Sequence, residues 1–277
     1  MKQELIAVSK KNHKNFFFTT VTGPQSSFEE FKATIFSPIL IDEVMTVASQ
    51  YPIAFQKTKN NKFILVCFFS LLKNINPFIN SENRWLGEYI PISFRTYPFI
   101  FNKLDRDSEP FLCFNPNSSL IKETNTPDFF PFFLENGDPS DQLQKILNIL
   151  KIVEENKLKT NQILESLANA ELMTEWPIEI RLNDGSFKIE GFHKIDNEKL
   201  KSLNTSQQNQ LFSNESLRLA YAQLISVNNL TKLKEMHMKV VIDNDSHKNI
   251  REITVEKQKQ EKKKELDSLV QDLFDTE

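Results

Sequence analysis

An aromatic residue followed by proline and apolar residues occurs three times in the chain, as YPIAF at Tyr51, YPFIF at Tyr97 and WPIEI at Trp176. Proline disfavours the helical conformation for the residue before it, so each site is expected to end a helix and open a strand. We expect a trans peptide bond at each site, although an aromatic residue before proline raises the share of the cis form. The three sites predict a fold in which helices and strands follow one another along the chain.

The second site closes the aromatic-rich stretch Glu82 to Phe101, which holds one of the two tryptophans and two of the four tyrosines. Asn83 is a suitable N-cap for a short helix in which Trp85 and Tyr89, four residues apart, share a face. On the opposite side of this helix, Arg84 is expected to pair with the glutamate four residues later.

Two prolines shape the second half of this stretch. Pro91 fits the first turn of a second short helix, which is expected to end at Thr96. The dipeptide Tyr97-Pro98 then stops the helix and leads into a strand from Phe99 to Phe101.

Hairpins indicate that neighbouring strands of the expected sheet run antiparallel. Short strands are predicted at Leu5–Val8, Asn15–Val21, Thr34–Ile39, Ile53–Gln56, Phe63–Phe69, Phe111–Asn115, Pro177–Leu182 and Phe187–Phe192. The polar turn at Lys59 to Lys62 joins two of these strands, and Asn183-Asp184-Gly185 is a strong signal for a second tight hairpin. Because hairpins pair neighbouring strands antiparallel, the sequence predicts an α+β fold, with a mixed, largely antiparallel sheet and flanking helices.

Helical periodicity is clearest from Ser140 to Met173. The polar patch at Glu154 to Lys159 leaves two possibilities, a hairpin of two helices or one helix with a solvated middle. Further helices are expected from Asp42 to Gln50, Asp196 to Leu203 and Asn214 to Met236.

A long connection, Asn115 to Ser140, contains the run FFPFF at Phe129 to Phe133. Four phenylalanines around one proline are costly to expose, so they either plug the core from a loop or await a partner. We favour the plug, because apolar loop segments commonly pack beneath the loop that carries them.

The charge of the chain does not favour polyanions. It has 34 Lys and Arg against 37 Asp and Glu, a net charge of -3 at pH 7 and a pI near 5.9. A nucleic acid partner is therefore not expected. The 5 glycines are too scattered for a phosphate-binding loop or a dinucleotide fingerprint, and no cofactor is expected.

The cysteines and the apolar runs indicate the cellular compartment of the protein. Cys67 and Cys113 each lie in an apolar run, where free cysteine behaves as a small buried hydrophobe; a single disulfide is the alternative. The N-terminal residues lack the apolar core of a signal peptide. The longest apolar run, Phe63 to Leu72, is far shorter than the roughly 20 residues that cross a bilayer. The sequence predicts a soluble, cytoplasmic protein without a transmembrane segment.

From His237 onward the chain is heavily charged, so the expected division is a main domain of residues 1–236 and a tail of residues 237–277 that is helical or disordered. The basic run of the tail is interleaved with glutamate, which favours a solvated face over a nucleic-acid patch. The tail ends in an amphipathic segment that is a candidate for docking to a partner, with Leu266, Leu269, Val270, Leu273 and Phe274 on one face.

The sequence contains no catalytic signature. The histidines do not occur at metal-ligand spacings, so no metal site is expected; they are His13, His193, His237 and His247. The residues best suited to a binding surface are planar cations and aromatic rings in the central stretch: Arg84, Trp85, Tyr89, Arg95 and Tyr97. The alternative, which we favour, places Trp85 and Tyr89 in the core and leaves the arginines solvated or structurally paired.

The order of several segments is similar to that in the SapC family. They are YPIAF, the RWLGEYIP and FRTYPF block, FLCFNPNSSLI, the hairpin DGSF with GFHKID, and SLRLAYAQLISVNNLTKL. The resemblance covers Leu5 to Met236, and the chain has His193-Lys194 where the family often has an aromatic residue and arginine. It implies a bacterial accessory protein linked to surface-layer or envelope systems, and it carries over no catalytic residues. Family members are often labelled peptide-transport permeases, a label that the short apolar runs contradict.

These observations lead to a hypothesis of function. We expect a protein that acts by binding or assembly with a protein partner, through the surface near Trp85 to Tyr97 and through the tail. One alternative is an enzyme of unrecognised type that acts on a peptide or surface protein. The other is a structural component of a lattice, which would associate with itself.

Overall fold

The computed structural model describes residues 5–22, 27–72, 74–105, 108–182 and 185–239. By its contacts the chain divides into one unit of residues 1–233 and a second of residues 234–277. The second unit is described only at 234–239, which are helical, so the boundary expected after residue 236 stays a prediction. The amphipathic segment at the end of the tail lies outside the described residues. No helix within the described ranges combines the length and apolar character that crossing a lipid bilayer requires.

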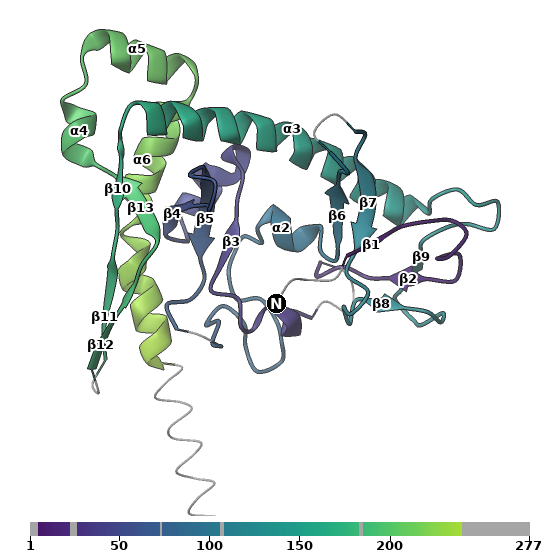
Figure 1. Cartoon of the computed structure of the whole chain (residues 1–277). Helices are drawn as coiled ribbons and strands as arrows, with labels where there is room; N and C mark the ends of the chain where they lie inside the picture. Colours follow the sequence, from purple (N-terminus) through teal and green to yellow (C-terminus); the bar gives the residue numbers. More distant parts are fainter. Residues whose placement is uncertain (1–4, 23–26, 73, 106–107, 183–184, 240–277) are drawn as a thin grey trace, which may run out of the picture. The chain divides into compact units, whose positions relative to one another are not determined.

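A five-stranded antiparallel sheet in the order β10-β13-β4-β5-β3 organises the larger unit (Figure 1). Its centre is the predicted hairpin of β4 (Ile53–Lys57) and β5 (Phe63–Phe68). Strand β3 (Phe36–Pro38) pairs with β5, while β13 (Phe192–Ile195) pairs with β4 and with the edge strand β10 (Met173–Glu175). Helices flank this sheet, so the predicted α+β class with a largely antiparallel sheet is confirmed.

Smaller antiparallel assemblies complete the β-structure. One sheet holds β1 (Ile6–Ala7), β7 (Phe111–Phe114) and β6 (Phe99–Asn102), a second holds β8 (Ile121–Lys122), β2 (Phe17–Phe18) and β9 (Phe130–Pro131), and a hairpin joins β11 (Ile178–Leu182) to β12 (Gly185–Ile189). The hairpin is the one predicted from Asn183-Asp184-Gly185, although its first two turn residues lie outside the described part.

The strongest helical pattern forms one helix, α3 (Asp141–Asn169), of 29 residues. The two-helix alternative is therefore wrong. Ser140 caps the helix, since its hydroxyl oxygen accepts a hydrogen bond of 3.2 Å from the backbone nitrogen of Leu143. The helix packs against β5, β6 and α6 (Ser216–Ser226), and its polar middle is solvated, with Lys159 2.6 Å from Glu215 in an ion pair.

Residues 229–239 are also helical, and the other helices of the described part are short. They are η1 (Glu29–Phe31), η2 (Ile41–Glu43), α1 (Val44–Ala48), α2 (Ile92–Arg95), α4 (Asn197–Lys201) and α5 (Thr205–Ser213). The sequence did not predict α5, because most of its side chains are polar; its buried residue is Leu211. A capping box between Asn204 and Gln207 was the available signal. The helix expected from Asn214 to Met236 is interrupted by a turn at 227–228.

The FFPFF run packs into the core through Phe132, with Phe130 and Phe133 half-buried against the same cluster. Phe132 is fully buried, and the centroid of its ring lies 5.4–5.9 Å from those of Phe16, Phe18, Phe99 and Phe114. We call these five rings the phenylalanine cluster; α3 covers it with aliphatic side chains. The plug interpretation is confirmed, and part of the plug is a strand, β9, which pairs with β2.

Both cysteines are free and buried, Cys67 in β5 and Cys113 in β7. The disulfide alternative is therefore wrong. Burial raises the pKa of both thiols, which keeps them in the neutral form that suits an apolar core.

Candidate functional site

The helix expected to begin at Asn83 is not formed. Asn83 itself has a φ of 62°, which is outside the helical region. The side-chain oxygen of Asn80 accepts a hydrogen bond of 2.8 Å from the backbone nitrogen of Arg84, and such local bonds compete with a helix. Arg84 is exposed, and it pairs with Glu82 at 3.3 Å and not with Glu88.

The second short helix is formed as expected. Helix α2 follows Pro91 and ends before Thr96, and β6 begins at Phe99. The peptide bond between Tyr97 and Pro98 is cis, whereas a trans bond was expected. The energy difference between the two isomers is small before proline, so the surrounding structure selects between them.

Trp85 lies within an aromatic core. Its ring stacks on Phe78 at 5.6 Å between centroids and contacts Phe28, Phe69 and Phe94 at 5.3–5.6 Å. Its indole nitrogen donates a hydrogen bond of 3.0 Å to the backbone oxygen of Tyr89. The structure thus gives Trp85 a packing role, with its polar atom satisfied inside the fold.

A buried carboxylate connects this core to α2. Glu43, which is 7% exposed, accepts hydrogen bonds from the Tyr89 hydroxyl at 2.9 Å and from the backbone nitrogens of Leu40 and Ile92 at 2.9 and 3.0 Å. The Tyr89 hydroxyl also accepts a bond of 3.0 Å from the Arg95 guanidinium, which lies 5.4 Å from the centroid of the tyrosine ring. Glu43, Tyr89 and Arg95 therefore form one network that holds the start of α2.

Burial raises the pKa of Glu43 above its ordinary value of 4.5, against the opposing effect of its hydrogen bonds. The folded chain therefore holds the proton of Glu43 at pH values where the unfolded chain has lost it. The resulting stability is fully present below pH 4.5 and is lost as the pH rises through the higher pKa of the folded chain. We predict that the free energy of unfolding of the wild type, minus that of Glu43→Gln, becomes smaller as the pH rises from about 4 to 7.

Denaturant titrations of both proteins at several pH values measure this difference. Glu88→Gln is the control for the loss of a glutamate side chain, because Glu88 is exposed in the same loop. A difference that grows with pH would mean that hydrogen bonding to the carboxylate, and not burial, controls Glu43.

Tyr97 connects α2 to the loop after β7. Its hydroxyl donates a hydrogen bond to Glu30 and accepts one of 2.8 Å from the side chain of Asn115. Burial, and then the hydrogen bond to Glu30, raises the pKa of Tyr97 to about 12. Glu30 also accepts hydrogen bonds of 2.8 and 2.7 Å from the hydroxyls of Ser118 and Ser119, so Tyr97 is held in a fixed position.

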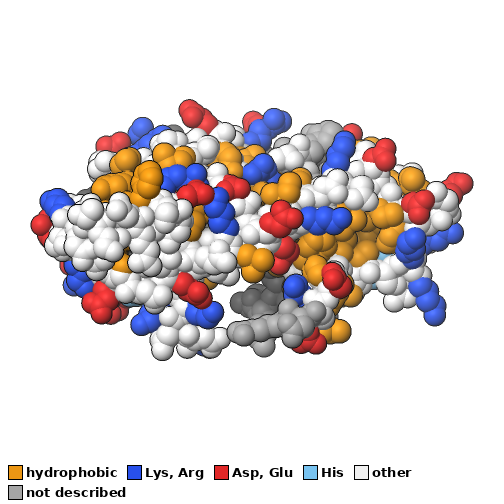
Figure 2. All heavy atoms as spheres, turned by 90° about the horizontal axis from the view of Figure 1, so that it is seen from above, with side chains coloured by type: hydrophobic (Ala, Val, Ile, Leu, Met, Phe, Trp, Pro, Cys, Tyr) orange, Lys and Arg blue, Asp and Glu red, His pale blue; other side chains and the backbone are white. Residues whose placement is uncertain are grey.

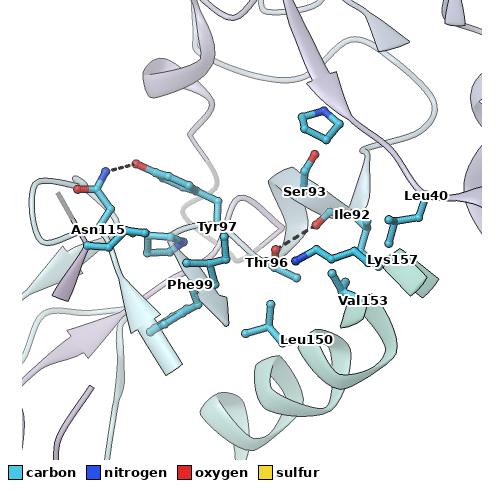
Figure 3. Close-up of a pocket in the computed structure, with 14 residues that line it drawn as sticks. Leu40, Ile92, Ser93, Thr96, Tyr97, Phe99, Asn115, Leu150, Val153 and Lys157 are labelled. Carbon is cyan, nitrogen blue, oxygen red and sulfur yellow. Dashed lines mark hydrogen bonds between the residues drawn. The ribbon is translucent and has the colours of Figure 1, made fainter. Parts of the chain in front are cut away.

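A pocket of about 350 Å³ lies between α2, the Tyr97-Pro98 turn and α3 (Figure 3). Its walls are mostly aliphatic and aromatic, and the lining residues are Leu5, Pro38, Leu40, Ile92, Ser93, Thr96, Tyr97, Pro98, Phe99, Ile100, Asn115, Leu150, Val153 and Lys157. The two faces of α2 differ in role, because Phe94 packs against Trp85 and Phe31 while Ile92 and Ser93 face the pocket. A concave apolar site with a few polar groups is the usual form of a ligand site.

The polar groups of the pocket are mostly occupied by the protein itself. The hydroxyl oxygens of Ser93 and Ser37 lie 2.7 Å apart, and the Thr96 hydroxyl donates a hydrogen bond of 3.3 Å to the backbone oxygen of Ile92. Lys157 pairs with Glu154, one turn earlier on α3. These bonds leave hydrophobic contact as the main interaction that the pocket offers.

Of the five residues predicted to form a binding surface, Tyr97 lines this pocket. Trp85, Tyr89 and Arg95 meet in the neighbouring core and network, and Arg84 lies exposed on the loop before them. The sequence did not assign a binding role to Leu150, Val153 and Lys157 of α3. Their spacing of three and four residues puts them on one face, which was the available signal for a lysine next to an apolar stripe.

Among the described residues, no group of three or more His, Cys, Asp and Glu side chains is placed to hold a metal ion. His13 instead has a structural role, since its Nδ1 accepts a hydrogen bond of 3.0 Å from the backbone nitrogen of Ser9 and its ring packs on Phe16 and Phe114. His193 packs on Phe63, and His247 lies outside the described residues.

Comparison with known proteins identifies a family and no closer relative. Neither the curated proteins nor the solved structures contain a match to this chain. The family model named SapC matches residues 8–233, which include the central sheet, the aromatic core around Trp85, and α2, α3 and α6. The match covers most of the 277 residues, and the chain therefore belongs to the SapC family.

Proposed function

We propose that this protein is a non-catalytic accessory protein that binds a protein partner by accepting an apolar side chain of that partner in the pocket beside α2. The apolar lining of the pocket is the observation that carries the proposal. Leu40, Ile92 and Val153 present aliphatic surface to a volume of about 350 Å³, and a partner side chain placed there would be removed from water.

The surface around the pocket supports this proposal. Leu5 and Ile100 line the pocket and are each 39% exposed, and the neighbouring Ile6 is 37% exposed. Figure 2 shows apolar side chains gathered in one area on the right-hand side of the face seen from above. An exposed apolar surface that continues into a pocket is typical of protein interaction sites.

The buried network explains how such a site is kept in shape. Glu43 and Tyr89 hold the start of α2, and Glu30 and Asn115 hold Tyr97 at its end. A wall that is already in position loses less conformational entropy when a partner binds. In this proposal Arg95 acts inside the network and does not contact the partner.

Membership of the SapC family suggests the biological context of this binding function. We propose that the partner belongs to a surface-layer or envelope system, and that the chain acts in the cytoplasm in its assembly. The amphipathic end of the tail, Leu266 to Phe274, would provide a second contact.

A display library of random peptides, selected on the immobilised full-length chain, tests the binding function. We expect the enriched peptides to share a large apolar residue. Val153→Phe, which places a ring in the pocket, should weaken their binding by about tenfold or more, as expected for loss of an interface hot spot.

Ile152→Phe is the matched control, because Ile152 precedes Val153 on the same helix, is 53% exposed and does not line the pocket. Thermal unfolding of both variants checks that the fold is kept, and Ile100→Glu at the exposed edge of the pocket gives a second test. Enriched peptides that bind all the variants as tightly as the wild type would refute the proposed function.

A further inference from the structure

Lys157 is the charged side chain among the residues that line the pocket. It extends from α3 with its ammonium group directed toward Thr96, between the aliphatic side chains of Leu40 and Val153 (Figure 3). A ligand in this pocket therefore meets apolar walls and a positive charge at one position. This combination of apolar walls and one positive charge favours a ligand in which an apolar group lies next to a negatively charged group.

The internal partner of Lys157 is replaceable. Glu154 pairs with it at i,i+3, and the two side chains are 31% and 42% exposed. Ion pairs in contact with water contribute little to stability, so a ligand carboxylate can take the place of Glu154 at low cost. Glu154 does not line the pocket, and its negative charge limits how strongly Lys157 attracts an anion.

The size of the pocket narrows the class of ligand. A volume of about 350 Å³ is near the lower end for ligand sites, so the pocket has room for one or two residues of a peptide. A peptide carries an apolar side chain and a carboxylate on the same residue only at its C-terminus. Capture of a C-terminal carboxylate is an established mode of peptide recognition.

We propose that the pocket beside α2 binds the C-terminal residue of a partner protein, with its aliphatic side chain against Leu40, Ile92 and Val153 and its carboxylate on Lys157. This inference rests on the proposed function and specifies which part of the partner enters the site. It assigns a recognition role to Lys157.

Two fluorescent hexapeptides with the same sequence test the inference, one ending in leucine with a free carboxylate and the other ending in leucine amide. Fluorescence anisotropy with the full-length chain at low salt measures both dissociation constants. The free acid should bind about tenfold more tightly than the amide, as expected for a hydrogen bond between charged groups. Lys157→Met should reduce this ratio to about one, whereas Lys157→Arg should retain most of it, since both cations can bind a carboxylate.

Glu154→Gln provides a third variant. Removing the competing carboxylate should strengthen binding of the free acid by about fivefold or less and leave binding of the amide unchanged. A purely structural role for the Lys157 pair would not produce an effect that depends on the end group of the peptide. A third peptide that ends in glycine should bind weakly, because it lacks the apolar side chain.

The outcomes separate this inference from the function on which it rests. Suppose that the free acid and the amide bind equally well, while Val153→Phe still weakens binding of the library peptides. That result would overturn the C-terminal assignment and leave the binding function intact. Binding of decanoate that depends on Lys157, without binding of the peptides, would overturn it in favour of a fatty-acid ligand. Absence of saturable binding of the leucine acid at millimolar concentration would also overturn it.

Discussion

Phe132→Ala is expected to lower the free energy of unfolding by about 3–5 kcal/mol, the usual range for removing a buried phenylalanine. Phe132 is fully buried and contacts four other rings of the phenylalanine cluster, Phe16, Phe18, Phe99 and Phe114. The substitution removes apolar contact and leaves a cavity beneath α3, which the surrounding rings and strands can fill only in part. Equilibrium unfolding in urea, followed by tryptophan fluorescence and circular dichroism, measures the change.

Phe212→Ala is the matched control. Phe212 lies in α5 and is 77% exposed, so its loss should change the free energy of unfolding by less than about 0.5 kcal/mol. If both variants lost equally little stability, the FFPFF run would not serve as part of the core. Coincident transitions in the two signals are needed for the comparison, because the free energies assume two-state unfolding.

Gly87→Ala is expected to lower the free energy of unfolding by about 1–3 kcal/mol or more, the range for overpacking a filled site. A Cβ atom at Gly87 would lie 2.1 Å from the hydroxyl oxygen of Tyr51 and 2.7 Å from the indole nitrogen of Trp85. Tyr51 is fully buried and cannot swing away, and both side chains donate hydrogen bonds to the backbone oxygen of Tyr89. The methyl group must therefore displace bonded, packed rings.

A double-mutant cycle with Tyr51→Phe tests the cause of this loss. Removing the hydroxyl group removes the closest clash, so Gly87→Ala should cost less in the Tyr51→Phe background than in the wild type. Leu86→Ala is the control in the same loop, because Leu86 is 57% exposed and should change stability little. An equal cost of Gly87→Ala in both backgrounds would refute the role of the Tyr51 hydroxyl.

Local sequence patterns predicted many of the elements. The hairpin of β4 and β5, the start of α3 near Ser140 and the strand that begins at Phe99 all follow from short segments. They are predictable because a turn, a cap or a proline acts on the few residues next to it. The helix expected at Asn83 is wrong for a reason that is also local, since the side chain of Asn80 accepts a hydrogen bond from the backbone of Arg84 and this competes with the helix.

The pocket could not be predicted in this way. It joins Leu40, α2, the Tyr97-Pro98 turn and Val153 with Lys157 of α3, which are separated by many residues in the chain. The sequence indicated that α3 has an apolar face, but it gave no sign of which segment that face would meet. The role of Trp85 was likewise open until its neighbours Phe28, Phe69 and Phe78 were known.

Residue order alone was enough to predict the α+β class, the strands after Tyr51-Pro52 and Tyr97-Pro98, and the resemblance to the SapC family, and it favoured burial of the FFPFF run. These properties depend on periodicity and on neighbours within a few positions, which the chain carries in its own order. Residue order was wrong at Trp176-Pro177, which lies between the strands β10 and β11 and does not follow a helix. The pocket, the network of Glu43 with Tyr89 and Arg95, and the position of Lys157 arise only when distant segments pack together. Their geometry depends on long-range contacts, and local propensities do not specify those contacts.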